Sequence, residues 1–165
     1  NGLSVRNGTF PSVGDADGED VFSFDRDTLG DTGLVGAAVF QNLTVTSFAE
    51  RAIDIVNEGS GTLDLDVLDV SANDNNDVFG EDAIRVQTEG SVNADVLISG
   101  GTYNNVELDV LAYFAQGTGT HLVEVTGVTS TNGGGPDNNP NGGGVAYVDL
   151  NVADIIVELV QRGPA

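Results

Sequence analysis

A sixteen-residue interval recurs three times in this chain, and it limits the folds that the chain can form. Short apolar cores centre on Ile53, Ile84 and Leu111, and a polar or glycine residue follows each core sixteen residues later. These later residues are Asp69, Gly100 and Gly127. The distance from such a residue to the next core varies from 11 to 15 residues. A fixed arc followed by a variable loop, repeated along the chain, predicts the coils of a β-solenoid.

The same pattern extends in both directions. Alignment of Asn42 with the three later corners gives spacings of 27, 31 and 27 residues. An earlier coil is expected to start at Leu3, and a last coil is expected to run from Val145 to Val160. We therefore expect one all-β domain over residues 1–165, a short parallel β-solenoid of about four to five coils. The Gly/Asn/Pro-rich segment 133–144 is expected to form a flexible loop on one coil.

Composition and alternation predict how the coils pack. The chain is 39% apolar and has no Trp, Met or Cys, so its core must be largely aliphatic. Alternating runs predict inward side chains that stack from coil to coil, and outward carboxylates at Asp64 and Asp95 that lie side by side. The predicted inward columns are Leu65–Val96–Val123 and Val67–Ile98–Val125.

Net charge restricts the partners of the chain. A formal charge of −21, with five Arg and no Lys, excludes a nucleic-acid surface and disfavours anionic lipid. The acidic surface fits either a solubilising, salt-adapted exterior or specific cation binding. No apolar run is long enough to span a membrane, and the absence of cysteine excludes thiol chemistry. The chain starts at Asn1, so we interpret it as a processed segment of an extracellular or cell-surface protein.

Acidic loops near the N-terminus are the candidate metal site. The run from Asp15 to Asp20 matches the start of a calcium loop, in which alternating carboxylates surround a glycine turn. The flanking helices and the terminal bidentate Glu of the complete motif are absent, so a solvated acidic loop is the alternative. The expected calcium ligands are Asp15, Asp17, Asp20, Asp25, Asp27 and Asp31.

The other candidate residues favour structural roles. The single histidine, His121, is expected to be packed or hydrogen-bonded rather than catalytic, because no nucleophile motif accompanies it. Arg51 and Arg85 lie close to equivalent positions in successive coils and are candidate basic residues of a polysaccharide lyase, with ion pairing to nearby acids as the alternative. Asn7, in Asn7-Gly8-Thr9, is the better of two N-glycosylation candidates, since Asn42 is expected to occupy a corner.

Three segments resemble the repeats of parallel β-helices: Asn42-Leu43-Thr44-Val45-Thr46, Ile98 to Asn105, and Val125 to Asn132. The resemblance is to pectate-lyase-like right-handed β-helices and to many surface proteins with that fold, and it covers roughly Leu34 to Val160. It implies a right-handed winding. Members of this class include polysaccharide lyases and hydrolases, phage tailspikes and adhesins, so the resemblance implies an architecture more than an activity.

Both ends of the chain look like coil material, without the caps that usually cover a solenoid. We therefore expect end-to-end stacking of copies, or of flanking coils in a longer surface protein. The predicted function is structural and not enzymatic: a segment of a cell-surface filament, sheath or adhesin stalk. The alternative is a carbohydrate-active or carbohydrate-binding β-helix. The predicted assembly residues are Leu3, Val5, Phe10, Ile155, Val157 and Leu159.

Overall fold

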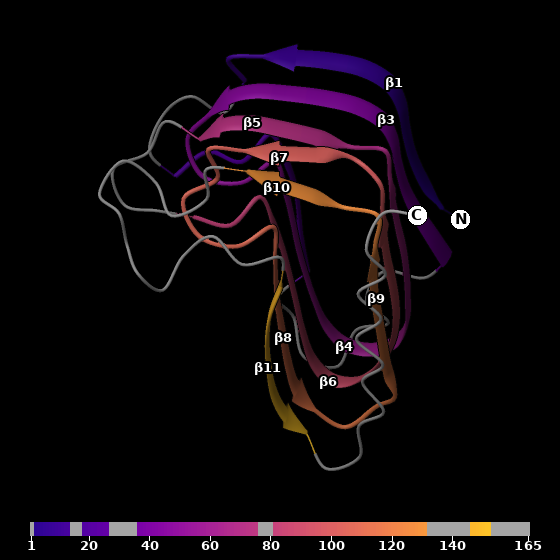
Figure 1. The fold of residues 1–165 in the computed structure, drawn as a ribbon. Helices are drawn as coiled ribbons and strands as arrows, with labels where there is room; N and C mark the ends of the chain where they lie inside the picture. Colours follow the sequence, from indigo (N-terminus) through magenta and orange to yellow (C-terminus); the bar gives the residue numbers. More distant parts are fainter. Residues whose placement is uncertain (1, 14–17, 27–35, 76–80, 132–145, 153–165) are drawn as a thin grey trace.

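The computed structural model describes residues 2–13, 18–26, 36–75, 81–131 and 146–152. These residues form parallel β-strands and no helix, and the strands wind as stacked coils (Figure 1). The predicted β-solenoid is confirmed. The strands pair in three ladders, which form three faces of the solenoid. The loop 133–144 and the predicted last strand around Val157 lie outside the described residues.

Each ladder contains five strand segments, so the pairing agrees with the predicted four to five coils. Face A consists of β2 (Phe22–Arg26), the first part of β4 (Ile53–Leu68), the first part of β6 (Ile84–Ser99), β8 (Leu111–Gly117) and β11 (Ala146–Val152). Face B consists of the first parts of β1 (Leu3–Pro11) and β3 (Gly36–Phe48), the second parts of β4 and β6, and β9 (His121–Thr126). Face C consists of the second parts of β1 and β3, then β5 (Ser71–Asn75), β7 (Thr102–Asn104) and β10 (Thr129–Thr131).

The register explains the sixteen-residue interval. Ile53 pairs with Ile84, and Ile84 pairs with Leu111, so the three apolar cores stack on face A. The residues sixteen positions later form the bend between faces B and C. All of them have a left-handed backbone, as does the predicted corner Asn42, with φ of 50° to 71°. Glycine, Asn and Asp adopt this conformation at the lowest cost, and this preference accounts for their recurrence at the bend.

A second set of glycines forms the bend between faces A and B, where the backbones of successive coils approach closely. Gly59, Gly90 and Gly117 occupy equivalent positions in three successive coils. A Cβ atom on Gly90 would lie 2.3 Å from the carbonyl oxygen of Gly59, and one on Gly117 would lie 2.2 Å from that of Gly90. Both glycines also have positive φ angles. The bend therefore requires glycine for two independent reasons, space and backbone conformation.

The interior of the solenoid is filled by stacked aliphatic side chains. Leu65, Val96 and Val123 pair in register and are fully buried, which confirms the first predicted column. The second column is confirmed too, since Val67, Ile98 and Val125 are paired and buried. Burial of each such side chain contributes about 1.5–3 kcal/mol. On the outer surface Asp64 lies directly opposite Asp95, as expected from the pattern.

Candidate functional site

The first coil lies at one end of the solenoid, and each of its strands, β1 and β2, pairs with a neighbouring strand on one side only. Among the described residues β1 pairs with β3 alone and β2 pairs with β4 alone. We call the free side of β1 and β2 the first-coil edge. A strand edge of this kind presents backbone N–H and C=O groups to which another strand can bond. It is therefore a template for further parallel pairing.

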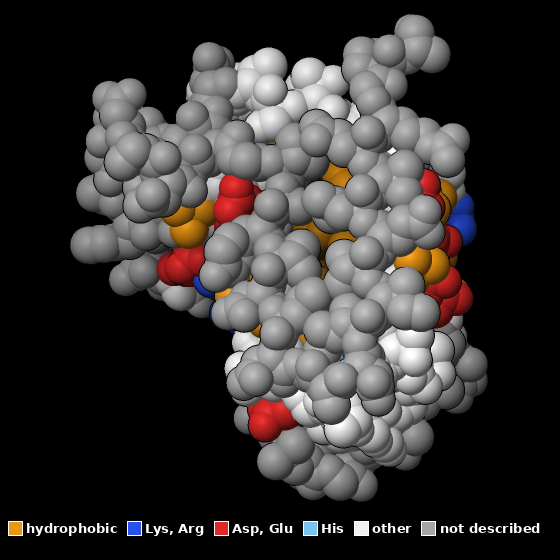
Figure 2. Space-filling model, turned by 60° about the horizontal axis from the view of Figure 1, so that its bottom comes forward, with side chains coloured by type: hydrophobic (Ala, Val, Ile, Leu, Met, Phe, Trp, Pro, Cys, Tyr) orange, Lys and Arg blue, Asp and Glu red, His pale blue; other side chains and the backbone are white. Residues whose placement is uncertain are grey.

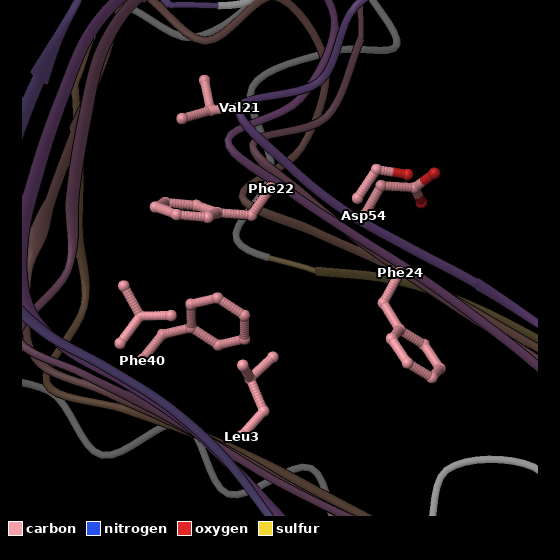
Figure 3. A pocket seen from close by; sticks show the side chains of 8 residues that line it. Leu3, Val21, Phe22, Phe24, Phe40 and Asp54 are labelled. Atoms are coloured by element: carbon pink, nitrogen blue, oxygen red, sulfur yellow. The ribbon is translucent and has the colours of Figure 1, made fainter.

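A hollow of about 390 Å³ opens into the interior of the solenoid beside this edge. Figure 3 shows Leu3 and Phe40 on one wall and Phe22 and Phe24 on the facing wall, whereas the carboxylate of Asp54 points away from Phe22. The lining is almost entirely apolar. Its residues are Leu3, Val5, Val21, Phe22, Ser23, Phe24, Phe40 and Asp54.

Aromatic packing fixes the walls of the hollow. The rings of Phe10 and Phe22 pack edge to face with their centroids 4.9 Å apart, and the ring centroids of Phe22 and Phe40 lie 5.5 Å apart. Such pairs contribute about 0.5–1.5 kcal/mol beyond the area that they bury. Val5 and Phe10 are only partly buried, and Leu3 is 37% exposed. The structure therefore brings three of the predicted assembly residues, Leu3, Val5 and Phe10, to one apolar edge.

The other predicted assembly residues, Ile155, Val157 and Leu159, lie outside the described residues. At that end of the solenoid the described part of the chain again shows one-sided pairing. There β9 pairs with β6, β10 pairs with β7, and β11 pairs with β8. The sequence pattern had not singled out Phe22 and Phe24 as edge residues. Their alternation with Ser23 at the start of the first complete coil was the available signal.

A cluster of charged side chains lies where the chain enters face A. Arg51 forms an ion pair with Glu81 of the next coil, and its Nη1 atom lies 3.6 Å from carboxylate oxygens of both Asp20 and Glu50. The backbone N–H of Arg51 also donates to Oδ1 of Asp20, at 3.1 Å. One arginine therefore links three successive coils. This cluster, named the Arg51 cluster, comprises Asp20, Glu50, Arg51, Asp54, Glu81 and Arg85.

Arg85 occupies the position directly opposite Asp54 in the face A ladder. Its Nε donates to Oδ1 of Asp54 at 2.7 Å, and its Nη2 donates to Oδ2 at 2.6 Å. The expectation that Arg51 and Arg85 occupy equivalent positions was wrong, because the position equivalent to Arg85 in the previous coil is Asp54. Both arginines are bound by carboxylates, which favours the ion-pairing alternative over the role of a lyase base.

Burial perturbs the carboxyl groups of the Arg51 cluster. It raises the pKa of Asp20 to about 6, with a further contribution from the neighbouring Asp54 carboxylate, and the positive charge of Arg51 opposes this shift. Burial also raises the pKa of Glu81, again against Arg51. Desolvation is the larger cause of both shifts, so the cluster holds carboxylates that burial has partly removed from water.

The calcium prediction gains little from the described residues. Asp15, Asp17, Asp27 and Asp31 lie outside them, while Asp25 lies exposed on β2. Asp20 is described, but its carboxylate contacts Arg51, which competes with any cation for the same oxygens. Within the described ranges, no group of three or more acidic or histidine side chains is placed to hold a metal ion. Calcium binding stays a prediction.

His121 is buried inside the solenoid, in agreement with a packing role. Its Nδ1 lies 2.6 Å from the hydroxyl oxygen of Tyr113, and burial lowers the pKa of its imidazole. This hydrogen bond satisfies one polar atom of each side chain in a layer that is otherwise apolar.

The two glycosylation candidates occupy the same corner in successive coils. Asn7 and Asn42 are both exposed, with φ of 56° and 52°, and Nδ2 of Asn42 donates to Oδ1 of Asn7 at 3.0 Å. The expected corner role of Asn42 is confirmed, although the bond joins two side chains and not a side chain and the backbone. Glycosylation of Asn7 stays a prediction.

Comparison of this chain with protein-family models, with curated proteins and with solved structures finds no match. The part of the chain that the structure describes contains no helix that could cross a membrane.

Figure 2 shows red acidic side chains near the margins of one face and orange apolar side chains between them.

Proposed function

We propose that this chain is a non-enzymatic, structural β-solenoid of the cell surface, which assembles end to end with further copies of itself through its first-coil edge. The observation that carries the proposal is the combination of two one-sided strands, β1 and β2, with an apolar hollow between them. An added coil would bond to the free backbone groups and fill the hollow with its own side chains. A segment of a filament, sheath or adhesin stalk needs such an edge, because it must bind the next segment.

The geometry of stacking favours an open polymer. A head-to-tail contact uses a different surface on each partner, so repeated addition extends a fibre and does not close. Each new junction would continue the interior columns, for which Leu3 and Val5 supply the terminal members in register with Ala38 and Phe40. The net charge of −21 would keep the sides of neighbouring fibres apart. Flanking coils of a longer surface protein would use the same edge.

A matched pair of substitutions tests this proposal. Leu3 at the first-coil edge and Leu122 on the outer surface of face B are both 37% exposed. Lysine at a strand edge disfavours strand addition, so Leu3→Lys is expected to reduce assembly, whereas Leu122→Lys is expected to leave it unchanged. Mass measurement by light scattering, over a range of protein concentration and with calcium or a chelator, gives the oligomeric state. Unaltered assembly of the Leu3→Lys variant, or a wild-type protein that stays monomeric throughout, would refute the proposal.

The carbohydrate-active alternative has less support from the described residues. Its candidate basic side chains, Arg51 and Arg85, are held by Glu81 and Asp54. A screen on acidic polysaccharides with the wild-type chain and an Arg85→Gln variant would test it directly. Activity that depended on Arg85 would favour the alternative over a structural role.

A further inference from the structure

The entry of the strand β2 is attached to the next coil by the carboxyl group of Asp20. Its Oδ1 atom accepts the backbone N–H of Arg51 at 3.1 Å. The backbone N–H groups that follow Asp20, those of Val21 and Phe22, donate to carbonyl oxygens of the same coil as Arg51. The strand is only five residues long and, among the described residues, pairs with β4 alone. The aromatic wall that β2 contributes to the hollow therefore depends on few bonds.

A second carboxyl group, that of Asp54, lies beside Asp20. Asp54 is opposite Ser23 of β2, is 4% exposed and lines the hollow. Both of its oxygens accept hydrogen bonds from Arg85. The side chain of Asp20 also forms a hydrogen bond with that of Asp54. Such a bond needs a proton on one of the two carboxyl groups, and since Asp54 already accepts at both oxygens, Asp20 is the donor.

Charged groups from two further coils surround this carboxyl pair. They are Glu50, Arg51, Asp54, Glu81 and Arg85. Arg51 is shared between Asp20 and two glutamates, so it does not serve Asp20 alone. Burial, with the charge of Asp54, raises the pKa of Asp20 to about 6, against the opposing charges of the two arginines. Above that pH both carboxyl groups are ionised, and repulsion replaces their hydrogen bond.

We propose that the Asp20–Asp54 pair is a proton-dependent switch that controls the first-coil edge. This inference rests on the proposed function, because it assigns a regulation to the same edge. When Asp20 is protonated, the pair attaches β2 to β4 and keeps Phe22 and Phe24 in the wall of the hollow. Loss of the proton separates the two carboxylates, and the entry of β2 detaches from Arg51. Assembly is therefore favoured in mildly acidic surroundings and weakened at neutral pH.

Two substitutions separate this switch from the general effect of charge. Asp20→Asn keeps an acceptor for the N–H of Arg51 and a donor for Asp54, but it does not titrate, so it is expected to assemble at pH 7.5 as well as at pH 5.5. Asp25→Asn removes one charge from an exposed position of β2 and is expected to keep the pH dependence of the wild type. Because one proton is linked to the switch, the concentration that the wild type needs for assembly should rise by up to about tenfold per pH unit above pH 6. Light scattering at a series of pH values measures that concentration.

Hydrogen exchange gives a second measurement that does not depend on assembly. In dilute protein, and after correction for intrinsic exchange rates, the backbone amides of Phe22–Arg26 should lose protection by up to about tenfold per pH unit above pH 6. The wild type and Asp25→Asn are expected to show this loss, whereas Asp20→Asn is not.

The two measurements distinguish failure of the switch from failure of the proposed function. Protection of β2 that is the same at every pH, or that falls equally in Asp20→Asn, would overturn the switch. Assembly of the wild type that does not change with pH would overturn the regulation and leave the proposed function intact. A wild-type chain that stays monomeric at every pH would refute the proposed function and the regulation together.

Discussion

Arg85 binds both carboxylate oxygens of Asp54 from the adjacent coil, with donor–acceptor distances of 2.7 and 2.6 Å. The Asp54 side chain is 5% exposed, and that of Arg85 is 27% exposed. The pair lies at the entry to face A, where it joins two neighbouring coils within the Arg51 cluster. A two-point pair of this kind fixes the register of the coils as well as their separation.

Substitution of Asp54 by Asn is expected to destabilise the fold. The change removes the charge that Arg85 opposes and leaves a half-buried guanidinium, so the free energy of unfolding should fall by about 2–3 kcal/mol. Denaturant unfolding of the two proteins measures the difference. Asp95→Asn is the matched control, because Asp95 is exposed and lies opposite Asp64. That control should change stability by less than about 0.5 kcal/mol, and an equal loss in both variants would contradict the role of the pair.

Glycine at the bend between faces A and B should be far less replaceable than glycine in an open turn. Gly90→Ala combines a positive φ of 89° with a Cβ that would lie 2.3 Å from the oxygen of Gly59. Gly18→Ala has a similar φ of 82°, but no atom lies within 4 Å of its added Cβ. The backbone strain common to both costs about 1–2 kcal/mol. Thermal unfolding should therefore show a clearly larger loss for Gly90→Ala, and similar melting temperatures for the two variants would argue against close stacking at this bend.

The raised pKa of Asp20, about 6, predicts a pH dependence of stability. Because the folded state holds this proton more tightly than the unfolded state, the contribution is complete below pH 4 and is lost as the pH rises through about 6. The free energy of unfolding should therefore decrease as the pH rises from 4 to 6, by about 1–3 kcal/mol in total. The raised pKa values of Glu81 and Asp82 act in the same direction.

Asp20→Asn removes the titrating group and should reduce that slope. Asp25→Asn, at an exposed position of the neighbouring strand, should retain it. Unfolding curves at a series of pH values for the three proteins make the comparison. If wild type and Asp20→Asn gave parallel profiles over this range, Asp20 would not be the source of the slope.

The hydrogen bond between Tyr113 and His121 gives a test of the interior. Tyr113→Phe keeps the ring and removes the hydroxyl that lies 2.6 Å from Nδ1 of His121. The buried imidazole then loses this partner, and the free energy of unfolding should fall by about 1–2 kcal/mol. Chemical denaturation measures the loss. No loss would mean that the bond does not compensate for burying the two polar atoms.

The sequence predicted faces A and B well, because apolar residues recur along their strands and a corner residue follows each apolar core after a constant interval of sixteen residues. The residues Asn42, Asp69, Gly100 and Gly127 were recognisable as a bend for the same reason. Face C was harder to predict, since its strands are as short as Thr102–Asn104 and their outward residues are polar but uncharged. Short polar runs of this kind predict turns as readily as strands.

The candidate sites were only partly predictable, because they depend on which residues meet across coils. Leu3, Val5 and Phe10 could be assigned to an edge from their place in the first coil. The contacts of Arg51 could not, since Asp20 and Glu81 lie 31 and 30 residues away and become neighbours only through the register. A one-residue difference in register would change every such contact. The glycines at the bend between faces A and B were missed for a similar reason, since close approach of backbones leaves no apolar pattern.

Fibre diffraction from a concentrated and aligned sample tests the central claim most directly. If copies stack through the first-coil edge, every coil lies across the fibre, and the spacing of about 4.8 Å between strands appears along the fibre axis. The account predicts filaments with that axial reflection, which the Leu3→Lys variant fails to form. A wild-type sample without filaments, or filaments with the reflection perpendicular to their axis, would contradict it.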